Sequence, residues 1–191
     1  GLVHFAHGEV YMLGAFFGFA LITVFHLPVF PSLLIAIIAS SIVGIMVERL
    51  VFKPLRKAPD VAPMVCTLGL SVVLQNVAML VWGSDTKSVP DVISGAVIPF
   101  FSSHISTSQI LIFAISLILM LILQYILYRS KLGRAIRATA QNKDAAALMG
   151  VNINKVISAT FALGSGLGGA AGVLVGLYYN AFYPTMGVMA G

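Results

Sequence analysis

Long apolar runs dominate the hydrophobic pattern of this chain. Four runs contain no Asp, Glu, Lys or Arg: residues 10–47, 61–84, 92–128 and 156–191. Because about 20 apolar residues cross a bilayer as an α-helix, these runs provide room for five membrane spans. The pattern predicts an all-α fold, a polytopic transmembrane helical bundle that forms a single domain over residues 1–191.

Prolines and aromatic residues mark the ends of the predicted spans. We expect spans over residues 10–25, 32–47, 63–82, 108–128 and 156–179. Pro28 and Pro31 punctuate the turn between the first two spans. Pro63 is tolerated in the first turn of a helix, and Trp82 suits the membrane–water interface.

The polar segments between the spans differ in charge. Residues 48–62 carry four basic residues and two prolines, which we expect to prevent a continuous helix, so a short positive loop is predicted there. Residues 83–107 have only Lys87 for basic charge and suggest an exposed loop with a short strand or hairpin near residues 92–101.

The distribution of basic residues predicts the orientation of the spans. Six of the eleven Lys and Arg residues lie in the loop 129–155, namely Arg129, Lys131, Arg134, Arg137, Lys143 and Lys155. The four basic residues in the loop 48–62 fall on the same side of the membrane, whereas Lys87 alone falls on the other side. The positive-inside rule therefore predicts that the loops 48–62 and 129–155 are cytoplasmic and the loop 83–107 lies outside.

Composition supports a membrane protein and narrows its chemistry. Of 191 residues, 59% are hydrophobic and 9% charged, which lies outside the range of soluble domains. The net charge of +5 comes from two short segments between apolar runs, so we interpret it as a topology determinant and expect no nucleic-acid partner. The single cysteine, Cys66, excludes an internal disulfide and is expected to be a small packing residue.

The two ends of the chain suggest that it is part of a longer protein. The chain begins with Gly1 rather than Met, shows no basic segment followed by a signal-peptide cleavage site, and stops within an apolar run. We expect it to be a fragment of a longer membrane protein.

Ionisable residues cluster just before the first span. His4, His7 and Glu9 flank Gly8, and an ionisable side chain at membrane depth is normally paired or faces water or a substrate path. One interpretation is a broken helix near the membrane midplane, with Gly8 at the break and backbone groups free to meet a polar solute. The other is that these residues lie wetted at the cytoplasmic interface. A zinc site is disfavoured, because the histidine spacing differs from the metalloprotease pattern and no third ligand is evident, so no metal or cofactor is predicted.

Two amides, Gln75 and Asn76, lie in the middle of the third predicted span. Amides in a membrane either bond across to neighbouring helices or line a polar path, and the structural interpretation is the commoner one.

The fifth predicted span is rich in glycine. Residues 164–169 match G-x-G-x-x-G, but no strand precedes them and no acidic residue follows about 20 residues later, so a dinucleotide site is excluded. A helix-packing face is predicted instead from four glycines spaced four apart: Gly164, Gly168, Gly172 and Gly176. Ser165 as an intramembrane nucleophile is a weak alternative, because no neighbouring span offers a histidine base.

A short helix is predicted within the loop 129–155. Asn142 can cap a helix over residues 143–149, Asp144 lies in its first turn, and Gly150 occupies the position of a left-handed terminator. This helix either docks into a groove on another protein or is a solvated connector.

Several motifs resemble a known family. Asp144-Ala-Ala-x-x-x-Gly150 is similar to the Glu-Ala-Ala-x-x-x-Gly motif of bacterial ABC importer permeases, with Asp in place of Glu. More specific are His4-Phe-Ala-His-Gly-Glu-Val-Tyr-Met-Leu-Gly14, Gly133-Arg-Ala-Ile-Arg-Ala138, Ala145-Ala-Ala-Leu-Met-Gly-Val-Asn152, and Glu48-Arg49 before Lys53-Pro54. In this order and spacing they resemble the permeases of branched-chain amino acid ABC transporters, in particular the first of the two permease types, over essentially the whole chain.

The resemblance implies an importer permease in the bacterial inner membrane. Its implied partners are a sister permease, two cytoplasmic ATPases, a periplasmic or lipid-anchored solute-binding protein and membrane lipid. It assigns ATPase docking to Asp144, Ala145, Ala146 and Gly150, with Arg134 and Arg137 orienting the loop. The translocation path is assigned to His7, Gly8 and Glu9 together with Gln75 and Asn76. ATP hydrolysis is expected on partners, because the chain lacks G-x-x-x-x-G-K-[ST].

A second function remains open at this point. A secondary transporter or channel for a small polar solute, such as urea or an amide, would work without ATPases. It predicts paired acids within the spans, and Glu9 alone is available.

Overall fold

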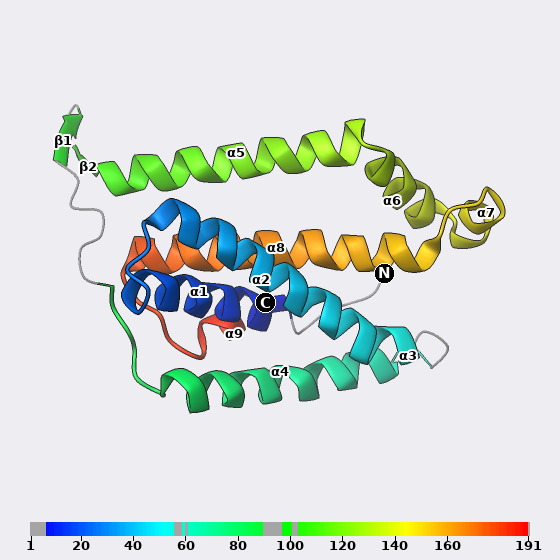
Figure 1. The fold of residues 1–191 in the computed structure, drawn as a ribbon, viewed down its shortest axis with the longest axis horizontal. Helices are drawn as coiled ribbons and strands as arrows, with labels where there is room; N and C mark the ends of the chain where they lie inside the picture. Colours follow the sequence, from blue (N-terminus) through cyan, green and yellow to red (C-terminus); the bar gives the residue numbers. More distant parts are fainter. Residues whose placement is uncertain (1–6, 56–58, 60, 90–96, 101–102, 191) are drawn as a thin grey trace. The chain divides into compact units, whose positions relative to one another are not determined.

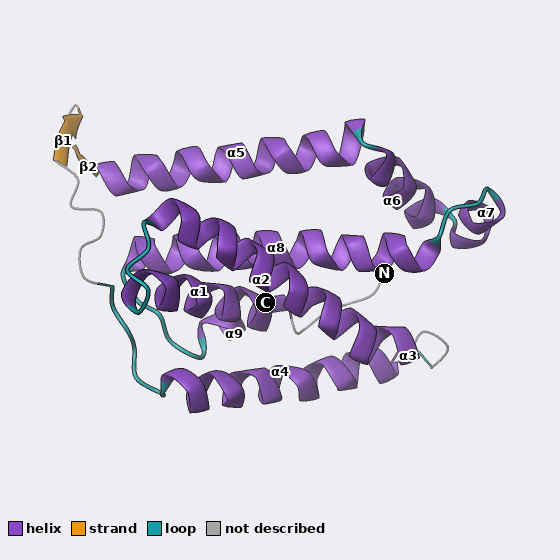
Figure 2. Cartoon of the chain, in the orientation of Figure 1, coloured by secondary structure: helices purple, strands orange, loops and turns teal. Residues whose placement is uncertain are grey.

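The computed structural model describes residues 7–55, 59, 61–89, 97–100 and 103–190, and almost all of them are helical (Figures 1 and 2). The elements in chain order are α1 His7–Thr23, α2 Val29–Val47, the π-helix η1 Glu48–Phe52, α3 Lys53–Leu55, α4 Val61–Trp82, β1 Val97–Phe100, β2 Ser103–Ser106, α5 Thr107–Arg129, α6 Lys131–Gln141, α7 Lys143–Leu148, α8 Ile153–Tyr179 and α9 Met186–Ala190. The predicted all-α class is confirmed, with one small β-hairpin added.

The chain forms two compact units. The first comprises Gly1–Val92 and Ala162–Gly191, and the second comprises Ile93–Phe161. The helix α8 therefore begins in the second unit and ends in the first.

Four helices in the described residues are long and apolar enough to cross a membrane. They cover Val29–Phe52, Val61–Trp82, Gln109–Arg129 and Ile153–Tyr179. A fifth apolar helix, Gly8–Thr23, is shorter than these. Each predicted span thus corresponds to a helix.

The expectation of a non-helical loop from residue 48 onward is wrong for residues 48–55. The chain continues without a break from α2 through η1 into α3, which contains Pro54. The Lys53 N–H donates to Glu48 O, five residues back, as a π turn requires. We attribute the uninterrupted helix to this wider turn, which adjusts the backbone just before the proline.

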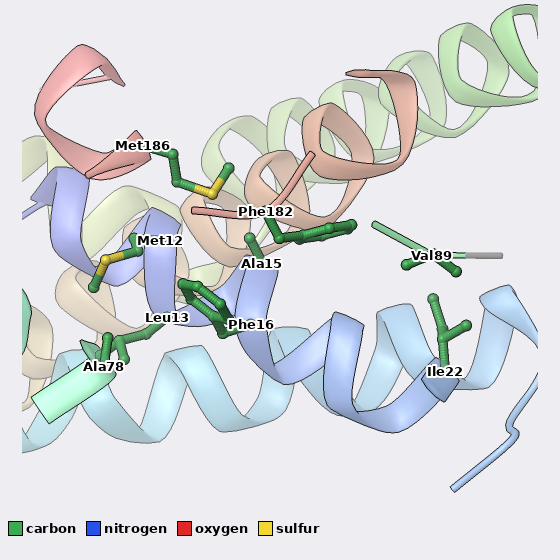
Figure 3. Close-up of a cluster of buried hydrophobic side chains, with 9 residues drawn as sticks. All are labelled: Met12, Leu13, Ala15, Phe16, Ile22, Ala78, Val89, Phe182 and Met186. Carbon is green, nitrogen blue, oxygen red and sulfur yellow. The ribbon is translucent and has the colours of Figure 1, made fainter. Parts of the chain in front are cut away.

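The first unit is built around α1. Five of its side chains form a buried cluster with residues from three other segments (Figure 3). The members are Met12, Leu13, Ala15, Phe16, Ile22, Ala78, Val89, Phe182 and Met186. The Phe16 ring also stacks on Trp82 at the end of α4, with ring centroids 5.1 Å apart. A helix that is apolar on all sides is stable where every side is covered, and α1 meets that condition.

Glycines let α8 approach its neighbours in the first unit. A Cβ added at Gly172 would overlap Tyr11 O of α1, and one at Gly176 would overlap the Phe182 ring. A Cβ added at Gly169 would overlap the Ser40 side chain of α2. A Cβ added at Gly14 of α1 would overlap the backbone of Gly169. Of the other two glycines in the predicted packing face, Gly168 is buried and Gly164 half-buried. Gly166, which was not predicted, faces Ser41 of α2.

Hydrogen bonds fix the segment that follows α8 in its place within the first unit. The N–H groups of Lys87 and Phe182 each donate to the other residue's carbonyl at 2.8 Å. The Val89 N–H donates to Asn180 Oδ1 at 2.8 Å. These bonds hold the segment that follows α8 beside the segment that follows α4, and α9 then packs against α1.

The second unit contains the hairpin and the helices that follow it. Strands β1 and β2 pair antiparallel, with Val97 opposite Ser106. This confirms the hairpin expected near residues 92–101, although its second strand lies a little later in the chain. In the first unit, Cys66 is exposed on α4, so the packing role expected for it is not found within the described chain.

We predict that Gly172→Ala lowers the stability of the protein. Its new Cβ would overlap Tyr11 O, so α8 and α1 must move apart, and overpacking of this kind costs about 1–3 kcal/mol. The temperature of unfolding in detergent, followed by intrinsic fluorescence, measures the effect.

Gly69→Ala is the matched control. A Cβ at Gly69 meets nothing within 4 Å, so this variant should be as stable as the wild type or slightly more stable. Equal unfolding temperatures for the two variants would contradict the close contact between α8 and α1.

Candidate functional sites

The corner between α5 and α6 is held by Ser130. Its hydroxyl donates to Ile126 O at 2.5 Å and accepts from the Gly133 N–H at 2.9 Å. Ser130 therefore caps the start of α6 while remaining bound to the last turn of α5. The sequence analysis did not predict α6, although Ser130 followed by good helix formers was an available signal.

Two further residues close this corner. A Cβ at Gly133 would overlap the carbonyl oxygens of Ile126 and Leu127, so α6 starts in direct backbone contact with α5. The Arg137 guanidinium donates to Leu127 O and lies 5.3 Å from the centroid of the Tyr128 ring. A cation at the C-terminal end of a helix is favourable for the helix dipole. Arg137 thus links α6 to the last turn of α5, and both Arg134 and Arg137 are exposed.

The predicted caps of α7 are confirmed. Asn142 Oδ1 accepts from the N–H groups of Asp144 and Ala145, each at 3.0 Å. Gly150 has a φ of +82°, the left-handed conformation that ends a helix. The local sequence is sufficient to specify this short helix at both ends.

The residues predicted for ATPase docking differ in exposure. Asp144, Ala145 and Gly150 are exposed. Ala146 is only 5% exposed, so its side chain offers little surface to a partner in this conformation. The physical reason is that α7 packs against α6 in the same unit, and a one-residue step around a helix turns a side chain from solvent to its neighbour.

Two large apolar side chains at the end of α7 were not among the predicted docking residues. Leu148 is 89% exposed and Met149 is 85% exposed. The available signal was a pair of bulky apolar residues directly before the terminating Gly150. Their exposure gives this end of α7 an apolar surface.

The connection from α7 to α8 is short and hydrogen-bonded. The Gly150 N–H donates to Ala147 O and the Val151 N–H donates to Ala146 O, each at 3.0 Å. Asn152 Oδ1 accepts from the Lys155 N–H at 3.1 Å and caps the start of α8. The two helices are therefore joined by a fixed turn.

A second polar site lies around Glu9 in the first unit. This side chain is only 2% exposed. Its Oε1 accepts from Ser71 Oγ at 2.7 Å and from Gln75 Nε2 at 2.8 Å, both on α4. Its Oε2 is buried and has no hydrogen-bond partner among the described residues.

The predicted pair of amides separates in the structure. Gln75 reaches across to Glu9, whereas Asn76 is exposed and donates to Val72 O of its own helix at 2.7 Å. Neighbouring residues on a helix point about 100° apart, so only one of them can face α1. Gly8 is buried beside Glu9, while the side chain of His7 and all of His4 lie outside the described residues.

The Glu9 site lies at the middle of a membrane span. Ser71 is the eleventh of the 22 residues of α4. At a rise of 1.5 Å per residue it lies about 15 Å from the start of that helix. Because Glu9 accepts a hydrogen bond from Ser71, the first described turn of α1 is level with the middle of α4. The burial of Glu9 at this depth disfavours a wetted interfacial position.

The C-terminal helix α9 closes the Glu9 site. A Cβ at Gly187 would lie 2.5 Å from Gly8 O and 3.1 Å from Glu9 Oε2. The backbone of α9 therefore rests against the first turn of α1. No group of three or more His, Cys, Asp or Glu side chains in the described part of the chain is placed to hold a metal ion.

Comparisons with known proteins identify the family of the chain. A family model described as "Branched-chain amino acid transport system / permease component" matches residues 1–191. The chain is 37% identical over 203 residues to the high-affinity branched-chain amino acid transport system permease protein BraD of Pseudomonas aeruginosa. It is 34% identical over 203 residues to the permease protein LivH of the corresponding high-affinity system of Escherichia coli.

These relatives are longer than the chain. Each alignment covers 100% of this chain and 66% of the relative. A probable branched-chain amino acid transport permease protein LivH of Methanocaldococcus jannaschii is 25% identical, over 90% of this chain and 56% of its own length. No solved structure matches the chain. On the match to the family model over its whole length, the chain belongs to the family of permease components of branched-chain amino acid transport systems.

Proposed function

We propose that the chain is the membrane-spanning core of a permease subunit in an ATP-driven importer of branched-chain or related amino acids. It forms the translocation path with a sister permease, and two cytoplasmic ATPases drive the cycle. A periplasmic or lipid-anchored binding protein delivers the solute to the outer face. The family match and the names of the relatives support this proposal, and the bacterial relatives support a place in the inner membrane.

The observation that carries the proposal is the exposed apolar end of α7. Leu148 and Met149 are 89% and 85% exposed although both are large and apolar. Adjacent exposed apolar side chains on a short helix are typical of a surface that another protein covers. Asp144 and Ala145 are exposed on the same helix, so they extend this surface.

The joints on either side of α7 support its role as a coupling helix. On one side, Ser130, Gly133 and Arg137 hold α6 against the end of α5. On the other, hydrogen bonds from the Gly150 and Val151 N–H groups to Ala147 O and Ala146 O hold the short turn that leads to α8 against the end of α7. A movement imposed on α7 is therefore passed to both membrane helices instead of being absorbed by a loose connection.

We predict that Leu148→Ser combined with Met149→Ser weakens binding of the ATPase subunits at least about tenfold. Truncation removes apolar surface that would be buried in the complex, and a single buried side chain of this size contributes about 1.5–3 kcal/mol. Co-purification of the ATPases with the tagged full-length permease measures the effect.

Lys143→Gln is the control on the same helix, because Lys143 is exposed and lies at the opposite end of α7. It should retain the ATPases. Unchanged binding in the double serine variant, or solute uptake by vesicles that lack the ATPases, would show that the importer proposal is wrong.

We predict that Gly133→Ala uncouples the subunits without separating them. Its Cβ would overlap Leu127 O and open the corner between α5 and α6. Uptake should fall about fivefold or more, because a displaced corner costs about 1–3 kcal/mol in the coupled movement, while the ATPases remain bound. Trypsin should also cleave faster after Arg129 and Lys131.

Ala140→Gln, at an exposed position of α6, should change neither uptake nor cleavage. Normal uptake by Gly133→Ala would show that a rigid corner is not needed for coupling.

We predict that the loop 129–155 is cytoplasmic and the loop 83–107 is external. In a Cys66→Ser background of the full-length protein, Lys155→Cys should react with a membrane-impermeant maleimide only in inverted vesicles. Asp85→Cys should react only in right-side-out vesicles. Both native residues are exposed, so labelling from the opposite sides would contradict the orientation.

A further inference from the structure

The buried Glu9 carboxylate uses only one of its two oxygens. A carboxylate has about four acceptor positions, and those on Oε1 are taken by Ser71 and Gln75. Oε2 is buried without a hydrogen-bond partner among the described residues. A charge in a membrane interior persists where it is paired, so the free oxygen marks a position for a donor or a cation.

We propose that Glu9 Oε2 binds the ammonium group of the transported amino acid at the middle of the membrane. The proposal rests on the proposed function and adds to it the group on the solute that is recognised. An ammonium brings a positive charge and three N–H donors, and therefore complements an oxygen that has no donor.

The two bonds from α4 prepare Glu9 for this role. Ser71 and Gln75 both donate to Oε1, so they fix the rotation of the carboxylate and reduce the cost of its charge. Neither side chain reaches Oε2. The free oxygen is therefore held in one direction before the solute arrives, which lowers the entropic cost of binding.

Gly187 of α9 lies next to Oε2. A Cβ at Gly187 would lie 3.1 Å from this oxygen, so glycine lets α9 come close without a side chain at that position. In the described conformation α9 covers the carboxylate. Solute reaches Oε2 when Met186–Ala190 shifts away from Gly8, and alternating access supplies such a step.

This recognition discriminates between solute classes. An α-amino acid supplies the cation that a buried carboxylate requires. Urea and simple amides are neutral and leave the charge uncompensated, so they are poor ligands for an ionised Glu9. Glu9 would thus favour amino acids over neutral solutes such as urea and simple amides.

Glu9→Gln tests the inference in the complete transporter, which comprises both permeases, the ATPases and the binding protein in proteoliposomes. Glutamine keeps the shape and an oxygen that can accept from Ser71 and Gln75, but it removes the charge. Leucine uptake should fall at least about tenfold, as expected for loss of a hydrogen bond between charged groups. Glu9→Asp keeps the charge and should transport better than Glu9→Gln.

Comparing ATPase binding with leucine uptake distinguishes a failure of the ammonium contact from a failure of the proposed function. Glu9→Gln should still bind the ATPases, because α7 is unchanged. Full leucine uptake by Glu9→Gln would overturn the ammonium contact and leave the importer proposal standing. Uptake by the wild type that does not require ATP would overturn the importer proposal itself.

A measurement on the wild type tests the same contact without a variant, whose folding could be impaired. In the complex of permeases and ATPases without the binding protein, millimolar leucine should raise the unfolding temperature. Its analogue 4-methylpentanoate, which lacks the amino group, should not. Equal shifts from the two compounds, or no shift from leucine, would overturn the inference.

Discussion

Backbone contact at glycine residues is the interaction on which the first unit depends. In a bilayer, apolar side chains gain little by leaving lipid for protein, so helices associate mainly where their surfaces fit closely. Gly172 and Gly169 on α8 and Gly14 on α1 provide that fit, because a Cβ at any of them would overlap the facing residue. With α8 on one side and α2, α4 and α9 on the others, α1 is covered, and its cluster of aromatic and aliphatic side chains is buried.

The burial of Glu9 follows from this arrangement. Because Glu9 is bonded to Ser71 in the middle of α4, the first described turn of α1 carries a carboxylate to a depth where an unpaired charge is costly. Ser71 and Gln75 satisfy one oxygen and leave the other without a partner in the described chain. A fold that needed only stability would be served as well by an apolar residue there. Under the proposed function, the ammonium group of the solute would supply the missing partner.

Outside the membrane, the chain is organised by hydrogen bonds at helix ends. Ser130, Asn142 and Asn152 each cap a helix, and Gly150 ends one in a left-handed conformation. Caps satisfy the free backbone groups at the ends of the short helix α7, and packing against α6 adds to its stability. The segment is thereby stiff at its joints while Leu148 and Met149 remain exposed. Stiff joints beside an apolar surface suit a part that receives movement from another protein.

The sequence by itself determined the features that depend on residues close together along the chain. The five apolar helices follow from run length, and the limits of α7 follow from Asn142 and Gly150. Tertiary contact decided which side of each helix faces which neighbour. It separated Gln75 from Asn76, buried Ala146 while exposing Leu148, and brought Gly166 and Gly169 into contact alongside Gly172 and Gly176. The reason is that an apolar membrane helix has no polar face to reveal its rotation, so its orientation is set by where another backbone can approach.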